Sequence, residues 1–226
     1  MPNHAQQIQS GKRFQFGQNW SRFLKTLNED RIENACASLK ARLGTYPIKG
    51  KSFLDMGSGS GLFSLAAARL GAHKIHSIDY DPQSVECTKE LKKRYFSNKK
   101  DWVITEGSAL DAAYLKTLDP ADIVYSWGVL HHTGDMWNAL GNMVSLTQKG
   151  GRLFVAIYND QGVQSRFWKQ AKKVYCGSKL GQAAVLGVFF PVFACGLFAV
   201  DVLQGRNPIK RYRDYKKNRG MSIAHD

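Results

Sequence analysis

The sequence predicts a doubly wound α/β fold built on a mostly parallel sheet of at least five strands. Strand-like segments alternate with helix-like segments between residues 50 and 160, as a parallel sheet flanked by helices requires. A glycine-rich turn follows the first strand-like segment, at the place where ligands bind in such sheets. The sequence has no internal repeat or low-complexity run, so we expect one sheet.

The strands of this core follow from short apolar runs, which fall at residues 53–56, 75–79, 102–105, 123–126 and 153–158. Helical spacing of apolar residues predicts helices at residues 62–70, 82–96, 112–118 and 166–175. We expect Gly150 and Gly151 to form the turn before the last strand.

Residues 20–43 repeat their apolar groups with helical spacing and are followed by Gly44, which predicts a helical layer before the sheet. The chain is therefore divided into three parts. Residues 1–48 form an N-terminal helical layer, and residues 49–160 form the ligand-binding core. Residues 161–226 form a C-terminal part with helices, an apolar insertion and a basic tail.

The turn after the first strand has glycine at three alternating positions, Gly57, Gly59 and Gly61. Glycine reaches positive φ angles, so the backbone can turn sharply and approach a ligand closely. Dinucleotide-binding loops require a glycine at the sixth position, which here is Leu62. Asp55 precedes the loop, where we expect its carboxylate to repel a diphosphate and attract an ammonium or sulfonium group. The loop therefore favours a cationic ligand.

Residues 53–61 resemble the first motif of the class I S-adenosylmethionine-dependent methyltransferases, which has a hydrophobic-Leu-Asp-x-Gly-x-Gly-x-Gly pattern. The resemblance extends over roughly residues 50–160. It implies a Rossmann-like core and S-adenosyl-L-methionine as the cofactor. It also implies transfer of a methyl group by in-line displacement.

Asp79 ends the second strand and follows Gly57 by about twenty residues, the separation that lets a carboxylate reach a ribose in a βαβ unit. Asp79 is the expected ligand of the ribose diol, and the adjacent Tyr80 is a further expected cofactor contact. The alternative is that Asp79 caps the next helix. Asp81 followed by Pro82 supplies a better start for that helix, so we favour the ligand role.

The third strand is followed by Ser108, Ala109 and Leu110, which we expect beside the adenine base. Similar methyltransferases often have an acid where Ser108 stands, hydrogen-bonded to the adenine amino group. Here the serine hydroxyl and the neighbouring backbone could bind the base edge, with Leu110 against its face. An ordinary helix N-cap at Ser108 is an equal alternative.

The fourth strand leads into Ser126 and Trp127, and then into His131 and His132. Related enzymes line the methyl-transfer site at this position, so we expect the first two residues beside the cofactor or acceptor. Either histidine could act as a general base, or could hold the loop by hydrogen bonds. Adjacent side chains point apart and a third ligand is lacking, so we predict no metal site.

The formal net charge of +14 favours anionic partners. The four cysteines lack the paired spacing of a zinc or redox site. The N-terminus lacks the basic start and apolar core of a signal peptide, so we expect a cytoplasmic protein, with membrane association as an alternative.

Residues 183–200 are apolar or small and reach the lower length of a membrane span, but Gly187, Pro191 and Gly196 interrupt them. We favour a helical hairpin that breaks near Pro191 and packs over the active site or in a protein interface. Peripheral contact with a membrane and a true span are the alternatives.

The basic tail at residues 210–219 could contact lipid headgroups or RNA phosphates, or form a solvated helix face. The resemblance implies two further strands that are not found after Tyr158, so the sequence could stop before them.

We therefore expect a methyltransferase that acts on a small-molecule or lipid-like acceptor. An RNA or protein methyltransferase is one alternative, supported by the positive charge, although the sequence has no recognisable nucleic-acid module. A non-catalytic S-adenosylmethionine-binding protein is the other. Asp55 and Leu62 argue against a nicotinamide dehydrogenase.

Overall fold

The structure is a computed structural model that describes residues 16–207 and residue 209. It divides into two compact units, one ending at Tyr158 and the other beginning at Asn159. The first unit contains the sheet and its helices, and the described part of the second contains two helices.

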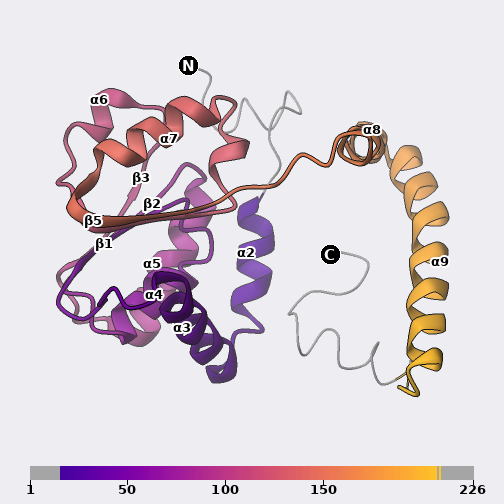
Figure 1. Cartoon of the computed structure of the whole chain (residues 1–226), viewed down its shortest axis with the longest axis horizontal. Coiled ribbons are helices and arrows are strands. Elements are labelled where there is room, and N and C mark those ends of the chain that lie inside the picture. Colours follow the sequence, from indigo (N-terminus) through magenta and orange to yellow (C-terminus); the bar gives the residue numbers. More distant parts are fainter. Residues whose placement is uncertain (1–15, 208, 210–226) are drawn as a thin grey trace. The chain divides into compact units, whose positions relative to one another are not determined.

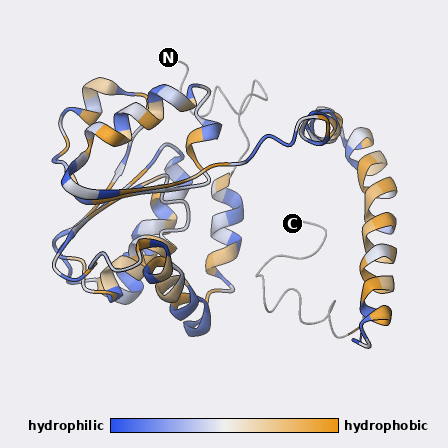
Figure 2. Ribbon diagram, viewed as in Figure 1, coloured by the Kyte–Doolittle hydropathy of each residue, from blue (hydrophilic) through white to orange (hydrophobic). Residues whose placement is uncertain are grey.

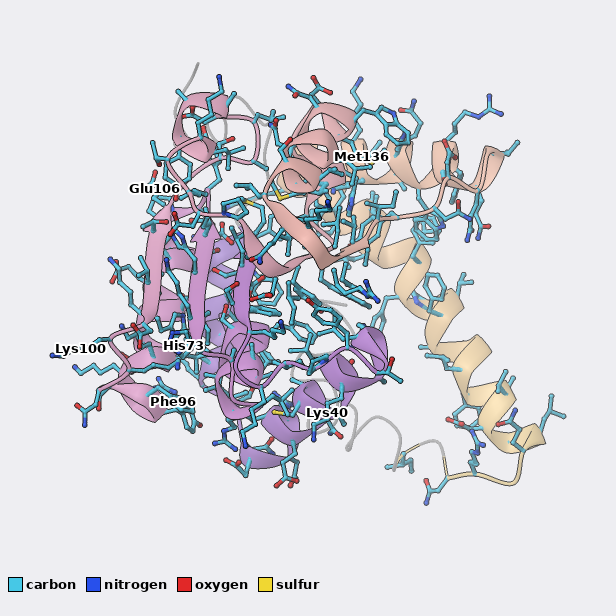
Figure 3. All side chains as sticks on the ribbon, turned by 60° about the vertical axis from the view of Figure 1, so that its left-hand side comes forward. Lys40, His73, Phe96, Lys100, Glu106 and Met136 are labelled. Carbon is cyan, nitrogen blue, oxygen red and sulfur yellow. The ribbon has the colours of Figure 1, made fainter. Side chains whose placement is uncertain are left out.

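Five parallel strands form the sheet, in the order β3-β2-β1-β4-β5. They are β1 (Ser52–Met56), β2 (Lys74–Asp79), β3 (Trp102–Glu106), β4 (Ala121–Trp127) and β5 (Thr147–Ala156). This confirms the predicted fold class. All carboxyl ends lie at one edge of the sheet, which is the edge of Glu106 in Figure 3, while His73 at the start of β2 lies at the opposite edge.

Helices cover both faces of the sheet. They are α2 (Phe16–Leu24), α3 (Glu29–Leu43), α4 (Leu62–Arg69), α5 (Pro82–Phe96), α6 (Ala112–Leu115) and α7 (Met136–Ser145), with a short 3-10 helix at Leu130–His132. Figure 1 shows α6 and α7 on one face and α3, α4 and α5 on the other. Successive strand residues point to opposite faces, so Phe53 packs in the core beneath α3 and α4 while Leu54 packs in the core beneath α7.

The predicted N-terminal layer contains two helices within residues 16–43, and Asn28 caps the second by accepting a hydrogen bond from the Arg31 N–H. Part of that layer, residues 1–15, lies outside the described residues.

The prediction for Gly150 and Gly151 was wrong. Both lie inside β5, where the pairing with β4 shifts register between Ala121 and Ile123. Gly150 has a φ of 80°, and a Cβ on Gly151 would stand 2.6 Å from the Asp122 carbonyl oxygen. The two glycines therefore form a bulge that lets the strand continue, and the strand starts earlier than its apolar run indicates.

The second unit corrects the hairpin prediction. Its helices are α8 (Val163–Gly177) and α9 (Lys179–Leu203), and α9 continues through Pro191 without a break. Proline gives up one hydrogen bond and crowds the carbonyl four residues earlier, which belongs to Gly187. Glycine lets that turn adjust, so the helix continues. The basic tail at residues 210–219 lies outside the described residues.

Candidate functional site

The candidate site lies at the carboxyl ends of the strands, where the glycine loop joins β1 to α4. Gly57, Gly59 and Gly61 have φ angles of 81°, 56° and 80°, which is the left-handed region that favours glycine. The sequence therefore predicted the three positions that need this residue.

The loop is bonded to the end of β2. The N–H groups of Gly57 and Ser58 donate to the Ile78 carbonyl oxygen at 2.7 and 3.0 Å. The Gly59 N–H donates to Asp79 Oδ2 at 2.8 Å. A diphosphate is usually bound by free N–H groups of such a loop. Because these donors already have partners, the loop is poorly suited to a dinucleotide, in agreement with the sequence prediction.

Three residues that the sequence did not single out enclose the loop. A Cβ on Gly57 would stand 2.4 Å from Val129 Cγ2, and one on Gly61 would stand 2.9 Å from the Thr88 Cα atom. A Cβ on Gly59 would stand 2.9 Å from Trp20 Nε1. Trp20 belongs to α2, so the N-terminal layer covers the loop. No local sequence signal connects Trp20 with a loop forty residues away.

Asp55 is not at the open mouth of the loop, and this corrects the electrostatic prediction. Its carboxylate is buried and accepts a hydrogen bond from Ser64 Oγ of α4 at 2.6 Å. Ser64 accepts from Ser77 Oγ at 2.7 Å, and Ser77 accepts from Trp102 Nε1 at 2.9 Å. We call these four residues the Trp102–Asp55 chain. It links β3, β2, α4 and β1 inside the core.

Burial raises the pKa of Asp55 to about 7, while the Ser64 hydrogen bond opposes the increase and the Asp79 carboxylate adds to it. Near neutral pH the side chain is therefore divided between its charged and neutral forms. A group in this state and position is a weak basis for attracting a cation. The preference against a diphosphate follows instead from the occupied N–H groups of the loop.

Asp79 lies at the end of β2 beside the loop, as predicted. Its Oδ2 accepts from the Gly59 N–H and its Oδ1 accepts from the Asp81 N–H at 2.9 Å. Asp81 caps α5 by accepting from the Gln83 N–H, so helix capping does not require Asp79. A carboxylate has further lone pairs, which could accept the hydroxyls of a ribose. Tyr80 follows directly and is half-buried.

The residues after β3 lie at the same edge, because the Gly107 N–H donates to the Asp79 carbonyl oxygen at 2.9 Å. Ser108 Oγ accepts from the Leu110 N–H at 3.2 Å, whereas Asp111 is the N-cap of α6. The N-cap alternative for Ser108 was therefore wrong. Ala109 is buried, and its carbonyl oxygen accepts from Asn142 Nδ2 at 2.8 Å.

Ser126 and Trp127 end β4, and both have partners within the sheet and its helices. The Ser126 hydroxyl is buried and donates to the Met56 carbonyl oxygen at 3.0 Å, which joins β4 to β1. The Trp127 ring stacks on Phe154 with centroids 5.8 Å apart, and the Arg42 guanidinium lies 3.9 Å from its centroid. Strand alternation directs Trp127 to the face covered by α3 and α4, so these contacts do not place it as a wall of the ligand site.

His131 and His132 lie in an aromatic cluster at the carboxyl ends of β4 and β5. The His131 ring centroid is 4.1 Å from those of His132 and Tyr158, and His132 is 5.3 Å from Phe16. The sequence analysis singled out the histidines but not Tyr158, which follows β5, or Phe16, which begins α2. Among the described residues, no group of three or more His, Cys, Asp and Glu side chains could hold a metal ion.

A family model described as a methyltransferase domain matches residues 27–177. The chain belongs to this family. The match includes the glycine loop, Asp79 and the histidine pair, and it agrees with the resemblance of residues 53–61 to S-adenosylmethionine-dependent methyltransferases.

Similar curated proteins match parts of the chain. A ubiquinone biosynthesis O-methyltransferase from Pelagibacter ubique is 28% identical over 56% of this chain and 50% of its own length. A ribosomal protein L11 methyltransferase from Tolumonas auensis is 40% identical over 23% of this chain and 18% of its own length. The chain thus spans half or less of the length of these relatives.

Solved structures share the fold. A structure from Methanococcus maripaludis has a TM-score of 0.53 at 18% identity, with 72% of this chain and 73% of that chain covered. Magnesium protoporphyrin IX methyltransferase from Synechocystis PCC 6803, solved with bound SAH, has a TM-score of 0.51 at 17% identity, with 75% and 83% covered.

The residues at the loop fit the family's cofactor. Three glycines at positive φ allow close approach of a ligand, and Asp79 provides a carboxylate at the loop. The loop N–H groups already donate hydrogen bonds within the protein, which disfavours a ligand with a diphosphate group. S-Adenosylmethionine has no such group.

Replacing Asp55 with asparagine should change how stability depends on pH. The pKa of Asp55 is about 7 in the folded chain, compared with an ordinary value of 3.8. Asp55 therefore holds its proton more tightly in the folded chain than in the unfolded chain. This contribution to stability is present below about pH 4 and is lost as pH rises to about 7. Asparagine does not titrate but can still accept from Ser64. Relative to wild type, Asp55→Asn should therefore gain on the order of 4 kcal/mol between about pH 4 and pH 8, measured by urea unfolding.

The matched control is Asp122→Asn. Hydrogen bonds from the Ser52 backbone and hydroxyl lower the pKa of Asp122, so its contribution is present above its ordinary pKa and is lost as pH falls. This variant should lose stability relative to wild type as pH rises. If the curves of Asp55→Asn and wild type ran parallel, the assigned pKa of Asp55 would be wrong.

Replacing Asp79 with alanine should weaken S-adenosylmethionine binding by about 2 to 4 kcal/mol, because hydrogen bonds to a carboxylate are lost. Calorimetric titration would measure the change. Asp101→Ala, an exposed acid before β3, should bind like wild type. Unchanged affinity in a folded Asp79→Ala protein would exclude the ribose role.

Proposed function

We propose that this chain is an S-adenosylmethionine-dependent methyltransferase that acts on a small-molecule or lipid-like acceptor. The observation that carries the proposal is the hydrogen bond from the Gly59 N–H to Asp79 Oδ2, within a chain of the methyltransferase family. It brings the glycine loop and the Asp79 carboxylate, which we expect to bind the ribose, to one point at the carboxyl ends of β1 and β2.

Bound S-adenosylmethionine would supply an activated methyl group, so the protein has to orient the acceptor and exclude water. In this chain the glycine loop and Asp79 would hold the cofactor, with the residues after β3 beside its base. Val129 and Trp20 lie over the loop and would keep water from it. If the acceptor is a hydroxyl, His131 or His132 would take its proton.

An apolar or aromatic acceptor suits the cluster formed by the two histidines, Tyr158 and Phe16. Aromatic rings bind flat apolar molecules by stacking and edge contacts. The partial similarity to a ubiquinone biosynthesis O-methyltransferase agrees with this acceptor class.

A protein methyltransferase is the second candidate. Partial matches to ribosomal protein L11 methyltransferases favour it. The formal net charge of +14 also favours it, since a basic protein is attracted to the anionic RNA of the ribosome. Methyl transfer from labelled cofactor to ribosomal protein L11, with none to a membrane lipid extract, would favour this candidate.

A thermal-shift comparison tests the cofactor. S-Adenosylmethionine and its demethylated product should each raise the melting temperature, because a ligand at about 100 times its Kd stabilises the folded state by about 2.7 kcal/mol. NAD should not raise it. A shift with NAD alone would overturn the proposal.

Replacing each histidine separately with glutamine tests the proton-transfer role. On a hydroxyl acceptor, either His131→Gln or His132→Gln should lower the rate of methyl transfer by about 10²- to 10⁴-fold with cofactor affinity unchanged. His73→Gln is the matched control, because His73 is exposed at the opposite edge of the sheet (Figure 3). Full rates in both site variants would exclude a histidine base.

A further inference from the structure

Helix α9 is apolar on all sides and exposed. It is the one helix in the described part of the chain that is long and apolar enough to cross a membrane, and none of its apolar window is buried. Figure 2 shows its hydrophobic colouring along almost the whole helix. Val188, Phe190, Phe193 and Phe198 are all exposed, and successive residues turn by about 100°. These positions therefore point in different directions around the axis.

The dimensions of α9 match a bilayer. Its 25 residues extend about 37 Å, against a hydrocarbon layer of about 30 Å. No charged residue lies between Lys179 and Asp201. Pro191, which is unfavourable inside a helix in water, is tolerated in membrane helices.

Helix α8 is amphipathic and basic. Arg166, Lys169, Lys172 and Lys173 are exposed and fall on one side of the helix by their spacing. Val163, Phe167 and Val174 are exposed on the other side. A basic face opposite an apolar face is typical of helices that lie at the surface of an anionic membrane.

Aromatic contacts hold α8 against α9. The Trp168 ring centroid is 5.1 Å from Phe189 and 6.1 Å from Phe193, and Phe167 is 5.9 Å from Phe189. The Gln182 amide donates to Tyr175 Oη at 2.8 Å near the start of α9. Tryptophan and tyrosine favour the membrane–water interface, so Trp168 and Tyr175 give α8 the composition of a helix that lies at the headgroups.

We propose that α9 inserts into a lipid bilayer that contains anionic lipids, with α8 lying at the headgroups. A soluble protein partner or a second copy would cover an apolar stripe on one side of a helix. An apolar surface around the whole helix requires surroundings that are apolar on every side, which a bilayer provides. The basic face of α8 favours a bilayer that contains anionic lipids.

Vesicle flotation of the full chain tests this interaction. Vesicles of phosphatidylcholine and vesicles of an equimolar mixture with phosphatidylglycerol should both carry the protein, and the anionic mixture should carry more. Washing with about 1 M salt, which screens surface charges, or with alkaline carbonate should leave the protein on the vesicles.

The double variant Val188→Glu with Val192→Glu should lose vesicle binding, by roughly 100-fold for each carboxylate placed in the hydrocarbon. The two valines are 60% and 63% exposed. The matched control is Val144→Glu in α7 of the first unit, where the valine is 57% exposed, and this variant should float like wild type. The double variant and the control should both bind S-adenosylmethionine as tightly as the wild type does. The result of the flotation test therefore does not depend on the proposed function.

Three results would overturn the proposal. The wild-type chain could fail to float with either vesicle, salt or carbonate could remove it, or the double variant could float equally well. Light scattering of a chain that fails to float would then detect a stable oligomer, which would assign α9 to contacts between copies.

Discussion

The site depends on the hydrogen bonds that join the 57–59 loop to the end of β2. Three successive N–H groups donate to Ile78 and Asp79, so the turn after β1 cannot move independently of the neighbouring strand. This attachment places the carboxylate beside the glycines and satisfies donors that would otherwise bind an anionic ligand. The parallel register of β1 and β2 makes the attachment possible, because it pairs Met56 with Ile78 directly before the turn.

Much of the fold was predictable because its signals are local. Short apolar runs predicted the first four strands to within two residues, whereas β5 starts six residues before its apolar run, and Asp81 with Pro82 marked the start of α5. The spacing between Gly57 and Asp79 reflects the length of one βαβ unit, so it predicted that the two would meet. Proline and glycine in α9 misled the prediction, because proline interrupts one hydrogen bond but does not by itself end a helix whose neighbouring turn can adjust.

The rest of the candidate site depends on tertiary packing. Asp55 is adjacent to the loop in sequence. Its side chain nevertheless points into the core, because of its position in β1 and its hydrogen bond from Ser64 of α4. The Ser126 hydroxyl is also turned into the core, where it donates a hydrogen bond that joins β4 to β1. Conversely, Trp20 of α2 and Tyr158, which follows β5, contact the loop and the histidines from segments distant in sequence. Single-sequence reasoning finds such residues only after the sheet order is known.

The stack beside β4 gives the protein an internal optical reporter. The guanidinium of Arg42 lies over the Trp127 indole, and its Nη1 atom is buried without a hydrogen-bond partner among the described residues. The electron-rich ring face therefore compensates the cation in place of an acceptor. Because α3 holds the arginine and β4 holds the indole, any separation of that helix from the sheet would alter the emission of this tryptophan.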